Sequence, residues 1–270
     1  MPNWTYNKFY FNNKEDFKLF KKVLVSKTNN GEEVDFNNLI PMPKSLEMPA
    51  GSVTDVSIMC YLTNNLETPY DDLDVDKKAL FVQLISPLPD ADNISQEIID
   101  RVNNFNETKD NLYELGKQYV KNYQNYGHTT WYNWRWKNWG VKWNASESFI
   151  GDKMISFNTP WSEPLPIIIK LVHDYPQINF VLSVEYEDIL GCPPKVFIYR
   201  DKELKLFQLV FPEKGSELYK KYLEEDSIYC FDDETEAFNP DSYFFDMFEK
   251  GQKEGFKGLE WTEVGNEIIE

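Results

Sequence analysis

The chain has 270 residues and a net charge of −17, with 41% hydrophobic and 16% aromatic residues. The aromatic content excludes a disordered chain, and the length suits one large domain or two ordinary ones. No apolar stretch approaches the roughly 20 residues that span a bilayer, and no secretory signal is visible. Three cysteines without a C-x-x-C pair support neither a disulfide framework nor a zinc site, so we expect a cytoplasmic protein without a membrane segment.

The N-terminal residues predict a strand, a helix and a second strand. Aromatic residues alternate over 6–11, and the apolar residues of 14–25 repeat at helical spacing. Residues 35–40 suit a short strand, which Pro41 would end.

Residues 44–125 predict mainly helices. Apolar residues recur there at helical spacing, most clearly over 110–124, where Gly127 is the expected stop. Ser95 is expected to cap another of these helices, because its hydroxyl suits an N-cap position.

The residues after the tryptophan-rich centre predict strands around one helix. Ile155–Phe157 suits a strand, and Ser162 is placed to cap a helix that runs to about His173. Residues 179–187 alternate like a half-buried strand. Two further strands are expected over 195–199 and 205–211.

This order of elements predicts an α+β fold: an antiparallel sheet with helices on one face. Residues 1–43 and 126–212 would form one discontinuous domain. Residues 44–125 would be a mainly helical insertion, and residues 213–270 an acidic C-terminal extension.

Five of the eight tryptophans lie between Trp131 and Trp143, and the surrounding residues 117–146 contain five cations and no acid. One interpretation is a core helix, whose five tryptophans would be buried between the sheet and the insertion. The other is a single-stranded nucleic-acid site, in which aromatic rings stack on bases and cations hold phosphates. Its contacts would be Trp131, Trp134, Arg135, Lys137 and Lys142. We favour the core interpretation and keep the second open.

Four motifs, in the same order, resemble the YubB-like proteins of phages and plasmids. They are Met1–Trp4, Phe36–Pro43, the tryptophan-rich Tyr126–Asn144 and Phe157–Pro166. The resemblance implies a ferredoxin-like domain encoded by mobile elements, and it supplies no catalytic residue. It does not cover the acidic residues beyond about 212.

Residues 201–270 contain 19 acidic and 8 basic residues. Such a segment repels nucleic acid and attracts basic protein surfaces, so it could imitate a phosphate track for a basic groove. The simpler alternative is a solvated cap. The candidate partner-binding residues are Glu224, Glu225, Asp226, Asp232, Asp233, Glu234 and Glu236.

No phosphate-binding glycine motif and no metal-binding histidine pattern occurs, so no cofactor or metal is predicted. We therefore expect a non-enzymatic mobile-element protein that binds a host protein with a basic surface, as an inhibitor of host defence. Two alternatives stay open: a single-stranded nucleic-acid-binding module, and a nucleotide- or small-ligand-processing enzyme using His128 with a carboxylate. The oligomeric state is not predicted.

Overall fold

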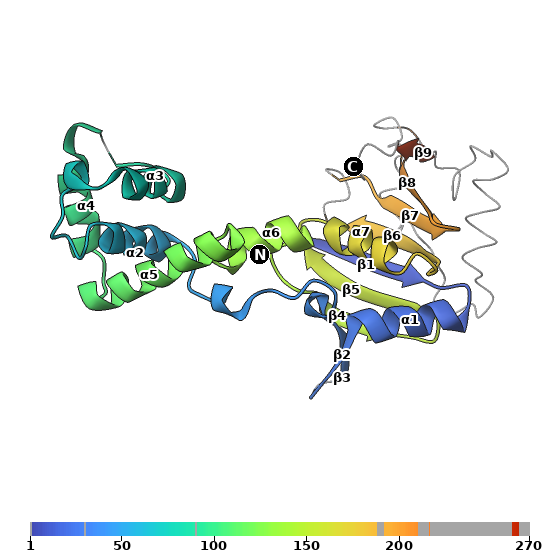
Figure 1. The fold of residues 1–270 in the computed structure, drawn as a ribbon. Coiled ribbons are helices and arrows are strands. Elements are labelled where there is room, and N and C mark those ends of the chain that lie inside the picture. The colour runs from blue at the N-terminus through green and yellow to red at the C-terminus, as the bar shows by residue number, and fades with distance from the viewer. Residues whose placement is uncertain are drawn as a thin grey trace. The chain divides into compact units, whose positions relative to one another are not determined.

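The computed structural model describes residues 2–29, 31–89, 91–187, 192–209, 216 and 261–264. Two compact units are defined by their internal contacts (Figure 1). The sheet unit consists of the described residues of Met1–Pro41 and Lys137–Glu270, and the helical unit is Met42–Trp136. Most of the predicted acidic extension lies outside the described residues.

The sheet unit is built on an antiparallel sheet, which in the described part of the chain has seven strands in the order β4-β5-β1-β6-β7-β8-β9. The strands are β1 (Trp4–Tyr10), β4 (Ser146–Ile150), β5 (Met154–Pro160), β6 (Phe180–Tyr186), β7 (Lys195–Arg200), β8 (Glu203–Leu209) and β9 (Trp261–Val264). The first strand lies between two strands from the second half of the chain, so the sheet depends on pairing between distant segments.

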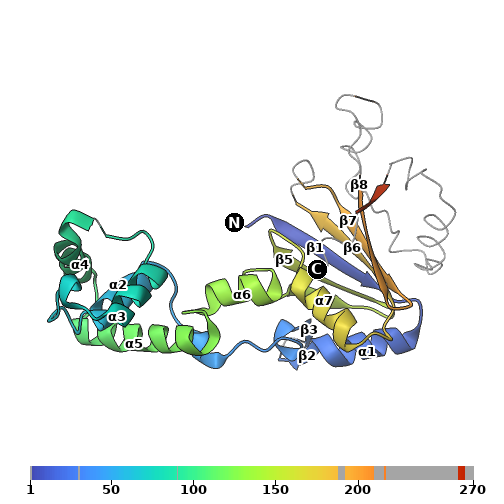
Figure 2. The ribbon, with the colours of Figure 1, turned by 45° about the horizontal axis from the view of Figure 1, so that its top comes forward.

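Two helices, α1 (Lys14–Leu24) and α7 (Leu165–Asp174), cover one face of this sheet (Figures 1 and 2). The ring of Phe9 in β1 lies 4.7 Å from that of Phe20 in α1 and 5.1 Å from that of Phe180 in β6. On the α7 side, the Tyr199 hydroxyl donates to the Val172 carbonyl at 3.3 Å. The predicted α+β fold with helices on one face is confirmed.

The predicted strand over 35–40 is wrong. A two-stranded hairpin, β2 (Val25–Thr28) and β3 (Gly31–Val34), precedes it, and Phe36–Asn38 form a 3-10 turn, η1. The Asp35 carboxylate accepts the backbone N–H of Asn37 at 2.9 Å, which favours a turn over an extended chain.

The prediction that β6 is half-buried is also wrong. Leu182 and Val184 face the helices, but the alternating residues Val181 and Ser183 are buried as well. The strand lies inside the sheet between β1 and β7, and residues on both of its faces are buried, so alternation alone could not predict its burial.

The helical unit packs its helices around a separate apolar core. Its elements are η2 (Lys44–Leu46), α2 (Ser52–Leu62), η3 (Tyr70–Asp72), α3 (Val75–Leu84), η4 (Ala91–Asn93), α4 (Ile94–Asn103) and α5 (Lys109–Tyr126). As predicted, Gly127 ends α5 in the left-handed conformation. Ser95 is not an N-cap: it lies inside the first turn of α4, and its hydroxyl accepts the Tyr70 N–H.

The helix α6 (Trp131–Trp139) contains the division between the units at Trp136, and Gly140 ends it with a φ of +77°. The expectation that Ser162 caps the following helix is wrong. Helix α7 begins after Pro164, and the Ser162 hydroxyl instead donates to the Gly140 carbonyl at 3.0 Å.

Candidate functional site

One row of side chains crosses the face of the sheet opposite α1 and α7. Phe9 packs against Phe20 of α1 and therefore points toward the helices. Successive residues of a strand point to opposite faces, so Tyr6, three residues before Phe9, points away from the helices. Tyr6 is paired with Asn158 of β5 on one side and with Glu185 of β6 on the other. The Tyr6 side chain is 38% exposed in the middle of this row.

Three carboxylates surround Tyr6. Partial burial, and then the charges of Glu187, Glu147 and Glu185, raise the pKa of the Tyr6 hydroxyl. Glu147 accepts the Asn158 amide at 2.6 Å, and Glu187 and Glu147 are exposed. We call Tyr6 with these three glutamates the Tyr6 surface. It combines an aromatic ring with concentrated negative charge.

A tryptophan cluster adjoins the Tyr6 surface. The ring of Trp143 lies 6.3 Å from that of Trp4 and 5.7 Å from that of Trp161. The Lys142 ammonium lies 5.1 Å from the Trp143 ring and 5.6 Å from the Trp161 ring, within cation–π distance of both. The Glu187 carboxylate accepts the backbone N–H of Trp4 at 2.8 Å and so links the cluster to the Tyr6 surface.

Trp161 is held in a strained conformation at the edge of this cluster. Its φ is +64°, a left-handed value that is unfavourable for a bulky side chain. The Trp161 N–H donates to the Asn3 carbonyl at 2.8 Å, which holds the segment against the start of β1. The ring is 41% exposed, so the strain presents an aromatic surface to solvent.

Behind the sheet, on the helix side, a buried network positions the start of α7. Glu163 accepts the Lys195 ammonium and the Tyr186 hydroxyl, each at 2.6 Å. Burial, and then the negative charge of Glu163, raise the pKa of Tyr186 far above its ordinary value. All three groups have partners within the protein, so we assign them to structure and not to a binding surface.

The residues predicted for nucleic-acid binding are divided between the two units. Trp131, Trp134 and Arg135 belong to the helical unit, and Lys137 and Lys142 to the sheet unit. Trp134 is only 7% exposed, which leaves little of its ring to stack on a base. The Arg135 guanidinium lies 5.0 Å from the Trp131 ring, and burial lowers the pKa of Arg135.

The expected burial of all five tryptophans is wrong. Trp134 and Trp139 are buried, whereas the other three are partly exposed. The Trp139 indole donates to the Ile40 carbonyl at 2.9 Å and meets the Phe36 ring edge-on at 5.8 Å. Trp139 therefore belongs to the core of the sheet unit.

The predicted partner-binding acids between Glu224 and Glu236 lie outside the described residues. His128, the proposed catalytic residue of the enzyme alternative, lies partly buried between α5 and α6. Within the described ranges, no group of three or more His, Cys, Asp or Glu side chains is placed to hold a metal ion.

Sequence reasoning singled out Lys142 as a binding residue but did not predict the other contacts of the tryptophan cluster or the Tyr6 surface. Alternation in β1 places Trp4 and Tyr6 on one face, but it would have pointed that face to the core, because the polar Thr5 and Asn7 on the other face are the buried residues. The three glutamates come from two distant strands and the residue after one of them. No local pattern indicates that they meet.

The fold places the sheet unit among ferredoxin-like α+β domains. Residues 138–204 match the family model described as the ferredoxin-like domain in Api92-like protein. The chain also matches a crystal structure of the protein Api92 from Yersinia pseudotuberculosis, with 10% sequence identity and a TM-score of 0.31, over 75% of this chain and 95% of that chain. No curated protein matches. Among the described residues, no helix combines the length and apolar character needed to cross a membrane.

Proposed function

We propose that this chain is a non-enzymatic accessory protein of a phage or other mobile element, which acts in the cytoplasm by binding a host protein with a basic surface. The observation that carries the proposal is the Tyr6 surface, an exposed aromatic ring among three carboxylates. The YubB-like motifs support the mobile-element context. Inhibition of a host defence enzyme, such as a nuclease with a basic groove, is the role that we propose.

The chemistry of the Tyr6 surface suits a protein interface. Tyrosine and tryptophan are enriched among the residues that dominate binding energy, and Glu187 links the Tyr6 surface to the tryptophan cluster. Carboxylates around such a ring speed association with a basic partner and disfavour acidic ones. Because strand pairing fixes the backbone of Tyr6 and Glu185, binding a partner costs no further backbone ordering at these two residues.

The test is an affinity pull-down from host lysate across a salt series, followed by titration of the partner identified by mass spectrometry. Tyr6→Ala and the double variant Glu147→Lys/Glu187→Lys should each weaken binding about tenfold or more, because one removes an aromatic contact and the other opposes the basic surface. A control, Asp76→Lys/Glu114→Lys, changes the net charge equally in the helical unit and should bind normally. Failure to retain any basic partner at low salt, or equal weakening by the control, would contradict the proposal.

The acidic C-terminal segment is a second part of the same proposal, which rests on the sequence alone. If it imitates a phosphate track, Asp232→Lys/Asp233→Lys should weaken binding of the same partner, most strongly at low salt. Unchanged affinity would remove the imitation of nucleic acid and leave the Tyr6 surface as the binding site.

A second candidate function is binding of single-stranded nucleic acid through the tryptophan cluster. Its support is the exposed Trp161 ring beside the Lys142 ammonium, a combination that stacks bases and attracts phosphate. The neighbouring carboxylates of the Tyr6 surface oppose it. Fluorescence anisotropy with a labelled oligonucleotide at low salt tests it, and Lys142→Ala/Trp161→Ala should abolish any binding. No change in anisotropy for the wild-type protein would exclude this function.

A further inference from the structure

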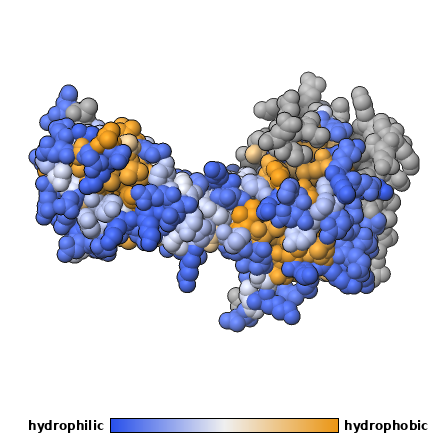
Figure 3. All heavy atoms as spheres, in the orientation of Figure 1, coloured by the Kyte–Doolittle hydropathy of each residue, from blue (hydrophilic) through white to orange (hydrophobic). Residues whose placement is uncertain are grey.

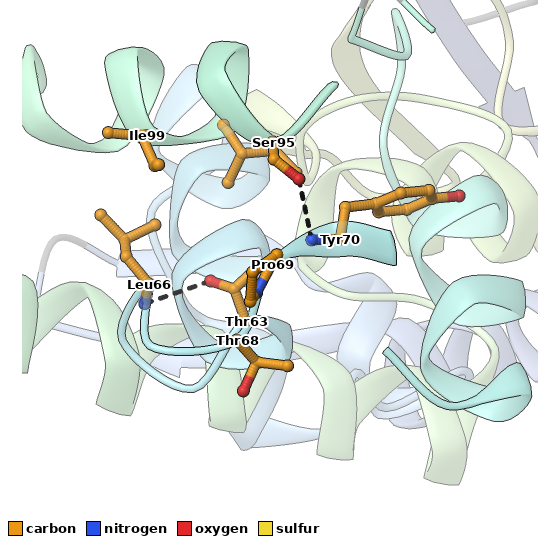
Figure 4. A pocket seen from close by; sticks show the side chains of 8 residues that line it. Thr63, Leu66, Thr68, Pro69, Tyr70, Ser95 and Ile99 are labelled. Atoms are coloured by element: carbon orange, nitrogen blue, oxygen red, sulfur yellow. Dashed lines mark hydrogen bonds between the residues drawn. The ribbon is translucent and has the colours of Figure 1, made fainter. Parts of the chain in front are cut away.

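The helical unit contains a pocket that the proposed function does not use. It lies between α4 and the connection from α2 to η3 (Figure 4), and its volume is about 80 Å³. The residues that matter for its shape are Leu66, Pro69, Tyr70, Ser95, Ile98 and Ile99. This volume is well below the roughly 300–1,000 Å³ of small-molecule pockets, so the pocket suits one apolar side chain and not a cofactor.

Two of the pocket walls are fixed to one another. The Tyr70 N–H donates to the Ser95 hydroxyl at 3.0 Å, which joins η3 to α4. The Tyr70 ring packs edge-on against Phe81 of α3 at 5.0 Å, and Ile98 is buried in the unit's core. The pocket is therefore formed before any ligand binds, which lowers the entropic cost of binding.

The remaining wall is a strained turn. Asn64, Asn65 and Leu66 have φ values of 49°, 60° and 68°, three consecutive left-handed residues. This conformation is tolerated by asparagine but is unfavourable for leucine. It is held by the Asn65 N–H donating to the Cys60 carbonyl at 2.8 Å and places Leu66 at the pocket. Leu66 also packs against the core of the helical unit, so the turn holds this side of the pocket in place.

The surroundings of the pocket are acidic. Glu67, Asp71 and Asp72 are exposed and directly adjoin lining residues in the chain. Lys78 is the cation beside them: its ammonium lies 5.7 Å from the Tyr70 ring and donates to the Asp71 carbonyl. Three carboxylates against one ammonium leave this rim negative, so it attracts cationic groups next to the pocket.

We propose that this pocket binds a peptide segment of a partner protein in which a leucine-, isoleucine- or phenylalanine-type side chain stands next to lysine or arginine. The apolar side chain fills the space between Leu66, Tyr70 and Ile99. The neighbouring cation meets Asp71 and Asp72, whose charges are exposed and add specificity. This site is independent of the Tyr6 surface, which belongs to the other unit.

The test is a selection of displayed random dodecapeptides on the full-length protein, with counter-selection on the Ile99→Lys variant. The winning sequence is then synthesised with a fluorescent label and titrated by fluorescence polarisation. We expect enriched peptides with an apolar residue next to lysine or arginine, and at least tenfold weaker binding by Ile99→Lys. The exposed-rim variant Asp71→Asn/Asp72→Asn should bind about three- to tenfold more weakly, and less so as salt rises.

Val82→Lys is the matched control, because it adds the same charge to the same unit outside the pocket. Val82 belongs to α3 and is 56% exposed. Figure 3 shows an apolar area in the region of α3. This variant should bind the selected peptide like the wild type, and circular dichroism should show that all variants fold. Absence of enrichment over Ile99→Lys, peptides without a basic residue, or equal loss in Val82→Lys would overturn the proposal.

Discussion

Gly116 of α5 is the position at which the helical unit tolerates least change. A Cβ atom there would lie 2.0 Å from the Ser57 carbonyl oxygen of α2 and 2.7 Å from the Tyr61 Cβ. The first of these neighbours is backbone, which cannot rotate away. Gly116→Ala therefore requires α2 and α5 to separate by about 1 Å, since Cβ contacts below 3.0 Å essentially do not occur.

Two opposite effects decide the magnitude of Gly116→Ala. Alanine favours a helix over glycine by about 1 kcal/mol. Overpacking costs about 1–3 kcal/mol and more where the backbone must move, as it must at Ser57. We expect the packing effect to win and the free energy of unfolding of the helical unit to fall by about 2 kcal/mol, or about 10 °C in Tm for a unit of this size.

The measurement is hydrogen exchange of the α2 and α5 amides, combined with urea unfolding, because exchange reports on the helical unit by itself in a chain of two units. The neighbouring Lys117→Ala, at an exposed position, should change stability by no more than about 0.5 kcal/mol. If Gly116→Ala slows exchange in α2 and α5, helix propensity outweighs packing and the close approach at Ser57 is refuted.

Three further predictions concern the sheet unit. Lys195→Met leaves the Glu163 carboxylate buried without its cation and should lower the free energy of unfolding in urea by about 3 kcal/mol. The double variant Lys195→Met/Glu163→Gln should restore most of this loss. Equal instability of both variants would contradict the ion pair. The raised pKa of Tyr186 means that the unfolded chain loses the phenol proton first. The contribution of the protonated Tyr186 to stability is therefore complete below about pH 10 and is lost as pH rises above that value. Tyr186→Phe should flatten the alkaline decline in Tm. An unchanged decline would argue against titration of Tyr186. Asn144→Ala removes the acceptor of the Phe36 N–H at 2.9 Å and should lower stability by about 1–2 kcal/mol, whereas an unchanged Tm would show that water replaces the side chain.

Local chemistry was sufficient to predict most of the elements. The repeat of apolar residues in α1 and α5 predicted both helices, because a buried helical face needs apolar side chains at that spacing. Gly127 was correctly predicted as a helix end, since a left-handed residue is easiest for glycine. The predicted strand at 35–40 failed because the Asp35 carboxylate accepts the Asn37 N–H, and this local hydrogen bond favours a turn over an extended chain.

The sequence by itself determined the fold class, an α+β domain with helices on one face of an antiparallel sheet, because the order and periodicity of the elements permit few other arrangements. Tertiary structure alone decided which side chains meet. Tyr6 lies among Glu147, Glu185 and Glu187 only because β1 pairs with two strands from the second half of the chain. Register between distant strands depends on the packing of the whole sheet, and a shift of one residue would turn Tyr6 into the core.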